Sequence, residues 1–80
     1  MLKDHWPQYL SLDEAQDLLA RMGLQLSRRQ IRRAAEKNAS GLRKLPFFVD
    51  PIDKKLKIEK STLLSIYRRL QVDAENNLRD

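Results

Sequence analysis

The chain has 80 residues, no cysteine and a formal net charge of +5 at pH 7. This length corresponds to one small domain, and the lack of cysteine excludes disulfides and thiolate metal sites. No apolar run approaches the roughly 18 residues of a membrane span, and residues 1–10 lack the pattern of a signal peptide, so we expect a cytoplasmic protein.

The first part of the chain predicts an arm followed by a helix. We expect residues 1–9 to form an irregular arm in which Trp6 is anchored on the core. Ser11 and Glu14 have the spacing of a capping box, which predicts a helix from residue 12 that Gly23 ends in a left-handed conformation. The predicted core stripe of this helix is Leu12, Ala15, Leu18, Leu19 and Met22.

Positive charge is concentrated in the middle of the chain. Residues 27–60 contain eleven basic and four acidic residues, a net charge of +7, whereas residues 1–26 have −2 and residues 61–80 have zero. Such segregation is typical of a surface that binds a polyanion. The alternative is a solvated face that is rich in arginine by chance.

A second helix is predicted over residues 27–38. Ser27 and Gln30 form another capping box, and Ile31 leads a narrow apolar stripe of small residues. At 100° per residue, Arg29 and Arg33 point away from that stripe, so they are candidates for a nucleic-acid contact. Two short helices joined by a turn containing glycine are typical of a helix-turn-helix.

Two short strands and a third helix complete the expected fold. Residues 46–49 and 54–59 predict a hairpin, turned at residues 50–53, with aromatic side chains inward and lysines outward. The alternative role for this hairpin is a lid whose lysines protect a sheet edge. We expect Ser61 to cap the last helix and residues 73–80 to fray. The predicted buried face of that helix is Leu63, Ile66, Tyr67 and Leu70.

The predicted order is helix, helix, strand, strand, helix, a mainly α fold with a small β-hairpin. Three local sequences, YLSLDEAQDLL, SRRQIRRAAEK and LPFFVDPIDKKLKIEKSTLL, resemble the winged helix-turn-helix domain of phage-type excisionases, which belong to the MerR-like group. The resemblance covers residues 9–70. It implies that Arg29 and Arg33 read bases in the major groove and that Lys54 or Lys55 enters the adjacent minor groove.

The chain departs from this family at two places. Asp50 and Asp53 stand at the hairpin tip, where acids weaken phosphate contact. The sequence also lacks the basic tail through which lambda-type excisionases touch an integrase and the coiled coil through which MerR regulators dimerise. We therefore expect a standalone module that acts alone or in cooperative arrays on DNA.

The resulting hypothesis is a nucleoid-associated, sequence-specific double-stranded DNA-binding protein of a mobile element, which bends DNA to direct site-specific recombination. Its partners would be DNA, further copies of itself and a tyrosine recombinase. The alternatives are a small transcriptional repressor, an accessory factor in plasmid transfer or replication, and an adaptor for an acidic protein. We expect no enzyme activity, metal or cofactor. The candidate DNA-binding residues are Ser27, Arg28, Arg29, Gln30, Arg32, Arg33, Lys37, Arg43, Lys44, Lys54, Lys55 and Lys57.

Overall fold

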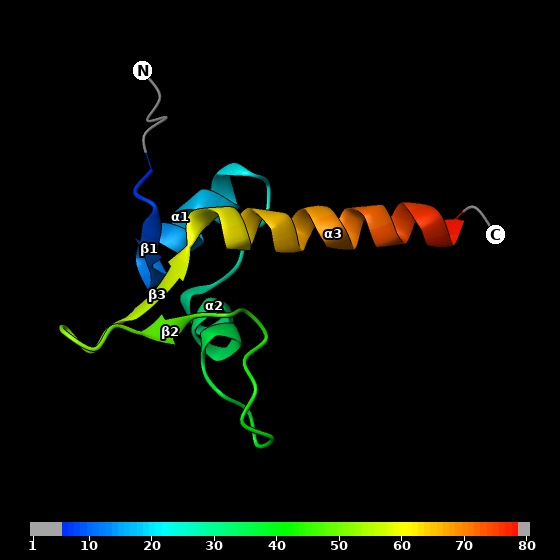
Figure 1. Ribbon diagram of the computed structural model, residues 1–80. Coiled ribbons are helices and arrows are strands. Elements are labelled where there is room, and N and C mark those ends of the chain that lie inside the picture. Colours follow the sequence, from blue (N-terminus) through cyan, green and yellow to red (C-terminus); the bar gives the residue numbers. More distant parts are fainter. Residues whose placement is uncertain (1–5, 79–80) are drawn as a thin grey trace.

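The computed structural model describes residues 6–78, so parts of the predicted arm (1–5) and tail (79–80) lie outside the described residues. Three helices and three antiparallel strands form a small helix-rich domain (Figure 1). This agrees with the predicted mainly α fold that carries a small hairpin. In chain order the elements are β1 (Tyr9–Ser11), α1 (Leu12–Arg21), α2 (Arg28–Ala35), β2 (Phe48–Val49), β3 (Leu56–Glu59) and α3 (Lys60–Leu78).

The sheet contains a strand that the predicted order lacked. β1 pairs with β3, which lies in the middle of the order β1-β3-β2, and Leu10 stands opposite Ile58. Both side chains are fully buried. The prediction that Tyr9 belongs to an irregular arm is therefore wrong, because three residues that run directly into a helix cap are too short to show a strand pattern. The expected anchoring of Trp6 is confirmed, since it packs against the core.

The hairpin strands are shorter than predicted, and only one of the two aromatic residues points inward. β2 consists only of Phe48 and Val49, and β3 begins at Leu56. The connection between the two strands therefore contains six residues, 50–55. Phe47 is buried at 3% exposure, whereas Phe48 is 41% exposed. Phe48 instead packs edge-on against Tyr9, with ring centroids 5.8 Å apart. Alternation along an extended chain explains why neighbouring aromatics face opposite ways.

The first helix and its turn agree with the sequence pattern. Ser11 and Glu14 form the predicted capping box. Gly23 has a φ of +95°, its N–H donates to the Ala20 carbonyl, and the N–H of Leu24 donates to the carbonyl of Leu19. These two bonds make a Schellman motif, which closes the helix end. Met22 becomes the C-cap and is exposed, so its predicted place in the core is wrong.

The core lies where α1, α2 and the start of α3 meet the sheet. Its ten buried residues come from all of these elements and from the segment before β2: Leu10, Ala15, Leu18, Leu19, Ile31, Ala35, Leu45, Phe47, Ile58 and Leu63. Because each element contributes only one to three of these side chains, the position of α2 depends on a few contacts.

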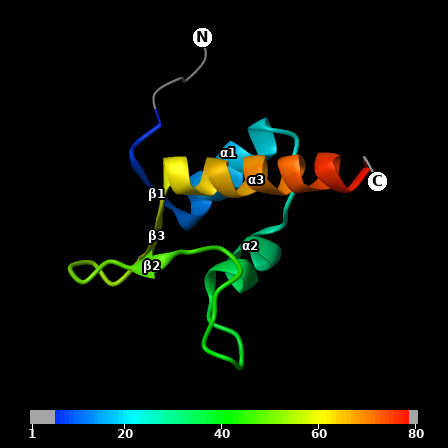
Figure 2. The ribbon, with the colours of Figure 1, turned by 45° about the vertical axis from the view of Figure 1, so that its right-hand side comes forward.

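α3 begins and ends differently from the prediction. It starts at Lys60, one residue before the expected cap Ser61, and it continues to Leu78 instead of fraying from Asp73. At 1.5 Å per residue its length is about 28 Å, and Figures 1 and 2 show it extending past the rest of the domain. Leu70, predicted to be buried, is therefore exposed. Helix-forming residues and a Gln71–Glu75 side-chain hydrogen bond support the projecting turns.

None of the helices within residues 6–78 has the length and apolar character needed to cross a membrane.

Candidate nucleic-acid interface

α2 is held at its N-terminus by the predicted capping box. The Ser27 hydroxyl accepts the Gln30 N–H at 3.1 Å, and the Gln30 side-chain oxygen accepts the Ser27 N–H at 2.8 Å. Together these bonds satisfy two backbone donors, and a cap of this kind contributes roughly 1 kcal/mol. Ser27 and Gln30 are two of the twelve candidate residues. Their hydrogen bonds determine the residue at which α2 begins.

The C-terminus of α2 differs from the prediction, because the helix ends at Ala35 and not near Asn38. The Asn38 side-chain oxygen accepts the N–H groups of Ser40 and Leu42, which favours a turn over further helix. The guanidinium Nε of Arg43 donates to the Ala35 carbonyl at 2.8 Å and so satisfies one of the last free acceptors. Lys37 consequently lies beyond the helix.

The outer face of α2 carries its four arginines. Ile31 and Ala35 are fully buried, so the helix lies against the core on its apolar stripe while the arginines remain exposed. Arg28 pairs with Asp13 at 2.8 Å, and Arg32 approaches Glu36 at 3.7 Å. Within residues 6–78, Arg29 and Arg33 have neither an ion pair nor a side-chain hydrogen bond. The two arginines that point furthest from the core are thus available to a ligand.

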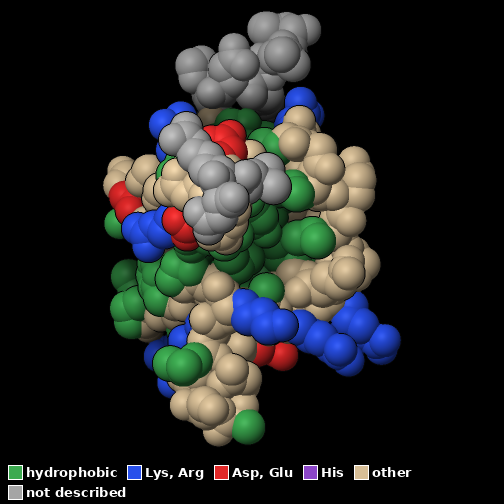
Figure 3. All heavy atoms as spheres, turned by 90° about the vertical axis from the view of Figure 1, so that its right-hand side faces the viewer, with side chains coloured by type: hydrophobic (Ala, Val, Ile, Leu, Met, Phe, Trp, Pro, Cys, Tyr) green, Lys and Arg blue, Asp and Glu red, His purple; other side chains and the backbone are tan. Residues whose placement is uncertain are grey.

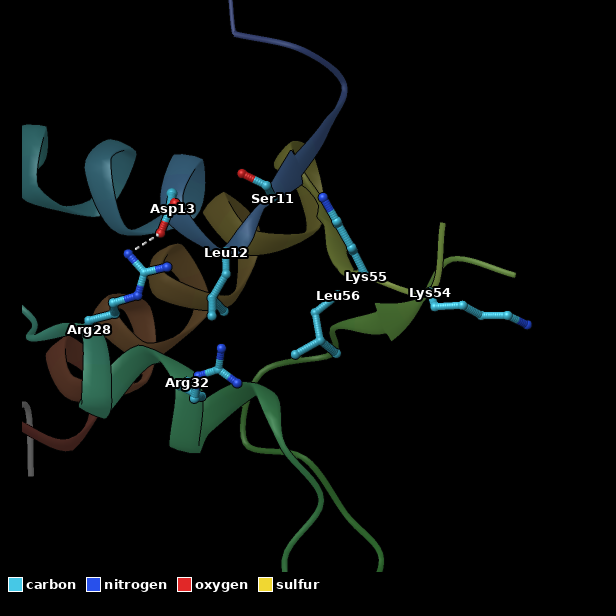
Figure 4. Close-up of a pocket in the computed structure, with 8 residues that line it drawn as sticks. All are labelled: Ser11, Leu12, Asp13, Arg28, Arg32, Lys54, Lys55 and Leu56. Carbon is cyan, nitrogen blue, oxygen red and sulfur yellow. Dashed lines mark ion pairs between the residues drawn. The ribbon is translucent and has the colours of Figure 1, made fainter. Parts of the chain in front are cut away.

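A groove of about 570 Å³ lies between α2 and the hairpin. Figure 4 shows that its walls come from the start of α1, from α2 and from the end of the hairpin connection. We call it the basic groove, and its lining residues are Ser11, Leu12, Asp13, Arg28, Arg32, Lys54, Lys55 and Leu56. Four basic residues and one carboxylate are among its lining residues, so they give it a net positive charge.

The hairpin tip, residues 50–55, keeps its acids turned inward. Lys57 Nζ lies 3.1 Å from an Asp50 carboxylate oxygen and 3.0 Å from one of Asp53. We call these three side chains the tip clamp. Lys57 is only 25% exposed, and its ammonium group already has two carboxylate partners in the free protein. Lys54 points away from the basic groove in Figure 4 and has a φ of 61°, which lets the chain reverse here.

Each carboxylate of the tip clamp has its pKa below the usual 3.8. For Asp50 the main cause is the hydrogen bond from the Ile52 N–H, followed by that from Lys57; for Asp53 the main cause is Lys57. The same contacts raise the pKa of Lys57 above 10.5. Lowered carboxyl pKa values mean that these contacts stabilise the tip fully above about pH 4 and are lost as pH falls through the folded values.

We expect Lys57→Ala to raise the pKa of Asp53 more than that of Asp50, because only Asp53 has Lys57 as its main partner. NMR titration of the side-chain carboxyl carbons measures both values. Lys55→Ala is the control, since Lys55 contacts Asp53 only through its backbone N–H. Unchanged pKa values in Lys57→Ala, or equal changes in both variants, would contradict the tip clamp.

Two further candidate residues lie outside α2 and the hairpin tip. Lys37 and Lys44 are exposed in the segment between α2 and β2. In Figure 3, Lys and Arg side chains gather at the level of α2, below a band of hydrophobic side chains. No group of three or more histidine, cysteine, aspartate or glutamate residues that could hold a metal is found within the described part of the chain.

The sequence pattern did not indicate that the start of α1 forms one wall of the basic groove. Asp13 lies in the first turn of α1, where an acid favours the helix dipole, and it also balances the charge of Arg28. The available signal was that a helix start carrying Asp13 and Glu14 precedes a strongly basic helix by a short turn. The contact itself depends on how α1 and α2 cross, which no local pattern specifies.

Comparison of the chain with protein-family models, with curated proteins and with solved structures finds no match in any of the three. The function must therefore be argued from the geometry of α2, the basic groove and the hairpin tip.

Proposed function

We propose that this chain is a winged helix-turn-helix protein that binds double-stranded DNA in a sequence-dependent way, with α2 in the major groove. The observation that carries the proposal is the outer face of α2, where four exposed arginines stand on a helix that is capped and anchored on the core. A major groove about 12 Å wide admits one helix, and arginine forks match guanine edges and phosphates.

The arginines of α2 divide into two groups. Arg29 and Arg33 lie one turn apart on the face opposite Ile31, where they can reach base edges. Arg28 and Arg32 line the basic groove, where a phosphate strand can replace Asp13 and Glu36 as their partner. Lys55 adds positive charge on the far side of the same groove, and the Lys54 side chain extends outward from that side. This division supports a role for Arg29 and Arg33 in reading bases. The other basic residues would contact the DNA phosphate backbone and so orient the protein on the duplex.

The biological role that fits best is excisionase-like: binding to repeated sites, self-association along them and bending of DNA to direct a tyrosine recombinase. This role rests on the resemblance of residues 9–70 to that family. A small repressor or an accessory factor in plasmid transfer or replication would use the same surface. An adaptor would use the positive charge of this surface to bind an acidic protein. It would show no preference for a specific DNA duplex over random DNA.

Selection from a randomised duplex library, followed by affinity measurements over a range of salt concentrations, tests the proposal. We expect enrichment of a defined site. If four to six phosphates are neutralised, the slope of log affinity against log salt should be about −4 to −5. Failure to enrich any site, or equal affinity for selected and random duplexes, would contradict sequence-dependent binding and favour the adaptor.

A further inference from the structure

The outermost part of the hairpin tip is apolar. Ile52 is 89% exposed, the largest exposed fraction among the large hydrophobic residues that the structure describes as exposed, and its neighbour Pro51 is exposed as well. The end of a turn between charged residues is an unusual place for a β-branched apolar side chain, because it gains nothing from packing there. Its apolar surface is therefore fully available for contact with a ligand.

Hydrogen bonds hold this apolar pair in a defined position. The Asp50 side chain accepts the Ile52 N–H at 2.8 Å, and the Asp50 carbonyl accepts the Lys54 N–H at 2.8 Å. The Asp50 N–H donates to the Lys55 carbonyl at 2.9 Å. Because proline also fixes its own φ, Ile52 is presented on a largely preorganised turn, which lowers the entropy cost of inserting it into a ligand.

The charges around Ile52 are arranged for an anionic ligand. The tip clamp turns both carboxylates back onto Lys57, while Lys54 and Lys55 stand two and three residues after Ile52, beyond Asp53. An apolar point followed by lysines is the chemistry that proteins use to insert a side chain between base pairs from the minor groove, where phosphates lie on both sides.

The position of the tip fits this use. Lys54 and Lys55 line the same groove as Arg28 and Arg32, so the tip lies on the side of the molecule where α2 presents its arginines. Figures 1 and 2 show the hairpin tip projecting from the body of the domain, with β2 between the tip and α2. If α2 lies in a major groove, a tip on the same side of the molecule can reach the neighbouring minor groove.

We infer that Pro51 and Ile52 form a wedge that enters the minor groove, partly unstacks one base step and kinks the DNA. The inference rests on the proposed DNA binding and adds to it the residue that bends the duplex. A pyrimidine–purine step is the expected site, because these steps unstack most easily. Insertion of this kind bends DNA by about 20–90°.

The test measures the distance between the dye-labelled ends of one selected duplex by energy transfer, at saturating protein. We expect the wild type and Ile52→Leu to bend the duplex and Ile52→Ser to leave it nearly straight. The Kd of Ile52→Ser should change by no more than about tenfold, because the lost apolar contact is offset by unstacking that no longer occurs. Val72→Ser, which alters an exposed apolar residue on α3, is the control and should bend like the wild type.

A second readout is 2-aminopurine placed at each step beside the α2 site, whose fluorescence rises where a base unstacks. A rise with the wild type that disappears in Ile52→Ser supports the wedge. Equal bending by the wild type and Ile52→Ser, or binding by the wild type without bending, overturns it while DNA binding stands. If the wild type binds no selected duplex, the proposed function itself fails. Because Ile52 is exposed, each variant is expected to fold, which circular dichroism verifies.

Discussion

Arg29→Ala and Arg33→Ala are each expected to weaken binding to the selected duplex by about 1–3 kcal/mol, or roughly 5- to 150-fold in Kd. The physical reason is that both guanidinium groups are exposed on the outer face of α2 and have no intramolecular ion pair in the described chain. The loss should be larger for the selected site than for random duplexes, because base contacts carry the sequence preference. Fluorescence anisotropy with both duplexes measures the two affinities.

The matched control is the double variant Arg68→Ala with Arg69→Ala. These arginines are also exposed and lie away from the apolar stripe of their helix, but that helix is α3. We expect them to leave the preference for the selected site intact. If the α3 variant lost as much preference as the α2 variants, or if Arg29 and Arg33 could be replaced without effect, α2 would not be the reading element.

The second large effect concerns stability. Ile31→Ala is expected to lower the free energy of unfolding by about 2–5 kcal/mol, as is usual when a buried large aliphatic side chain is truncated. Ile31 is fully buried and is the only large apolar residue with which α2 contacts the core. A domain of this size has a stability near the lower end of the usual range of about 5–15 kcal/mol, so the substitution should remove a large part of it.

Ile52→Ala makes the same chemical change at an exposed position, and we expect it to change the free energy of unfolding by at most about 0.5 kcal/mol. Urea unfolding followed by circular dichroism compares the two variants with the wild type. Similar losses in both variants, or a loss of well under 1 kcal/mol for Ile31→Ala, would contradict the packing of α2 on the core.

The elements that local chemistry specifies were predictable. Both capping boxes, at Ser11 and Ser27, appear as expected, and Gly23 adopts the left-handed conformation that its position required. The separation of apolar and basic faces on α2 was also predictable from the sequence, because helical periodicity alone determines which residues lie opposite Ile31.

The features that depend on contacts distant in sequence were not predictable. β1 exists because Leu10 pairs with Ile58 across the chain, and three residues carry no pattern of their own. α2 ends early because the Asn38 side chain accepts the N–H groups of Ser40 and Leu42 in a turn, and because Arg43 donates to the Ala35 carbonyl. Folding of the tip brings both Asp50 and Asp53 to the ammonium group of Lys57, an arrangement that no local pattern indicated.

The most direct test of the account is an amide NMR titration of the full chain with the selected duplex. If α2 and the hairpin form the DNA surface, the amide signals of residues 27–35 and 50–55 should shift in proportion to bound DNA, while those of residues 68–77 in α3 should stay in place. Shifts confined to α3, or no saturable shift anywhere, would contradict the claim that the arginine face of α2 binds DNA.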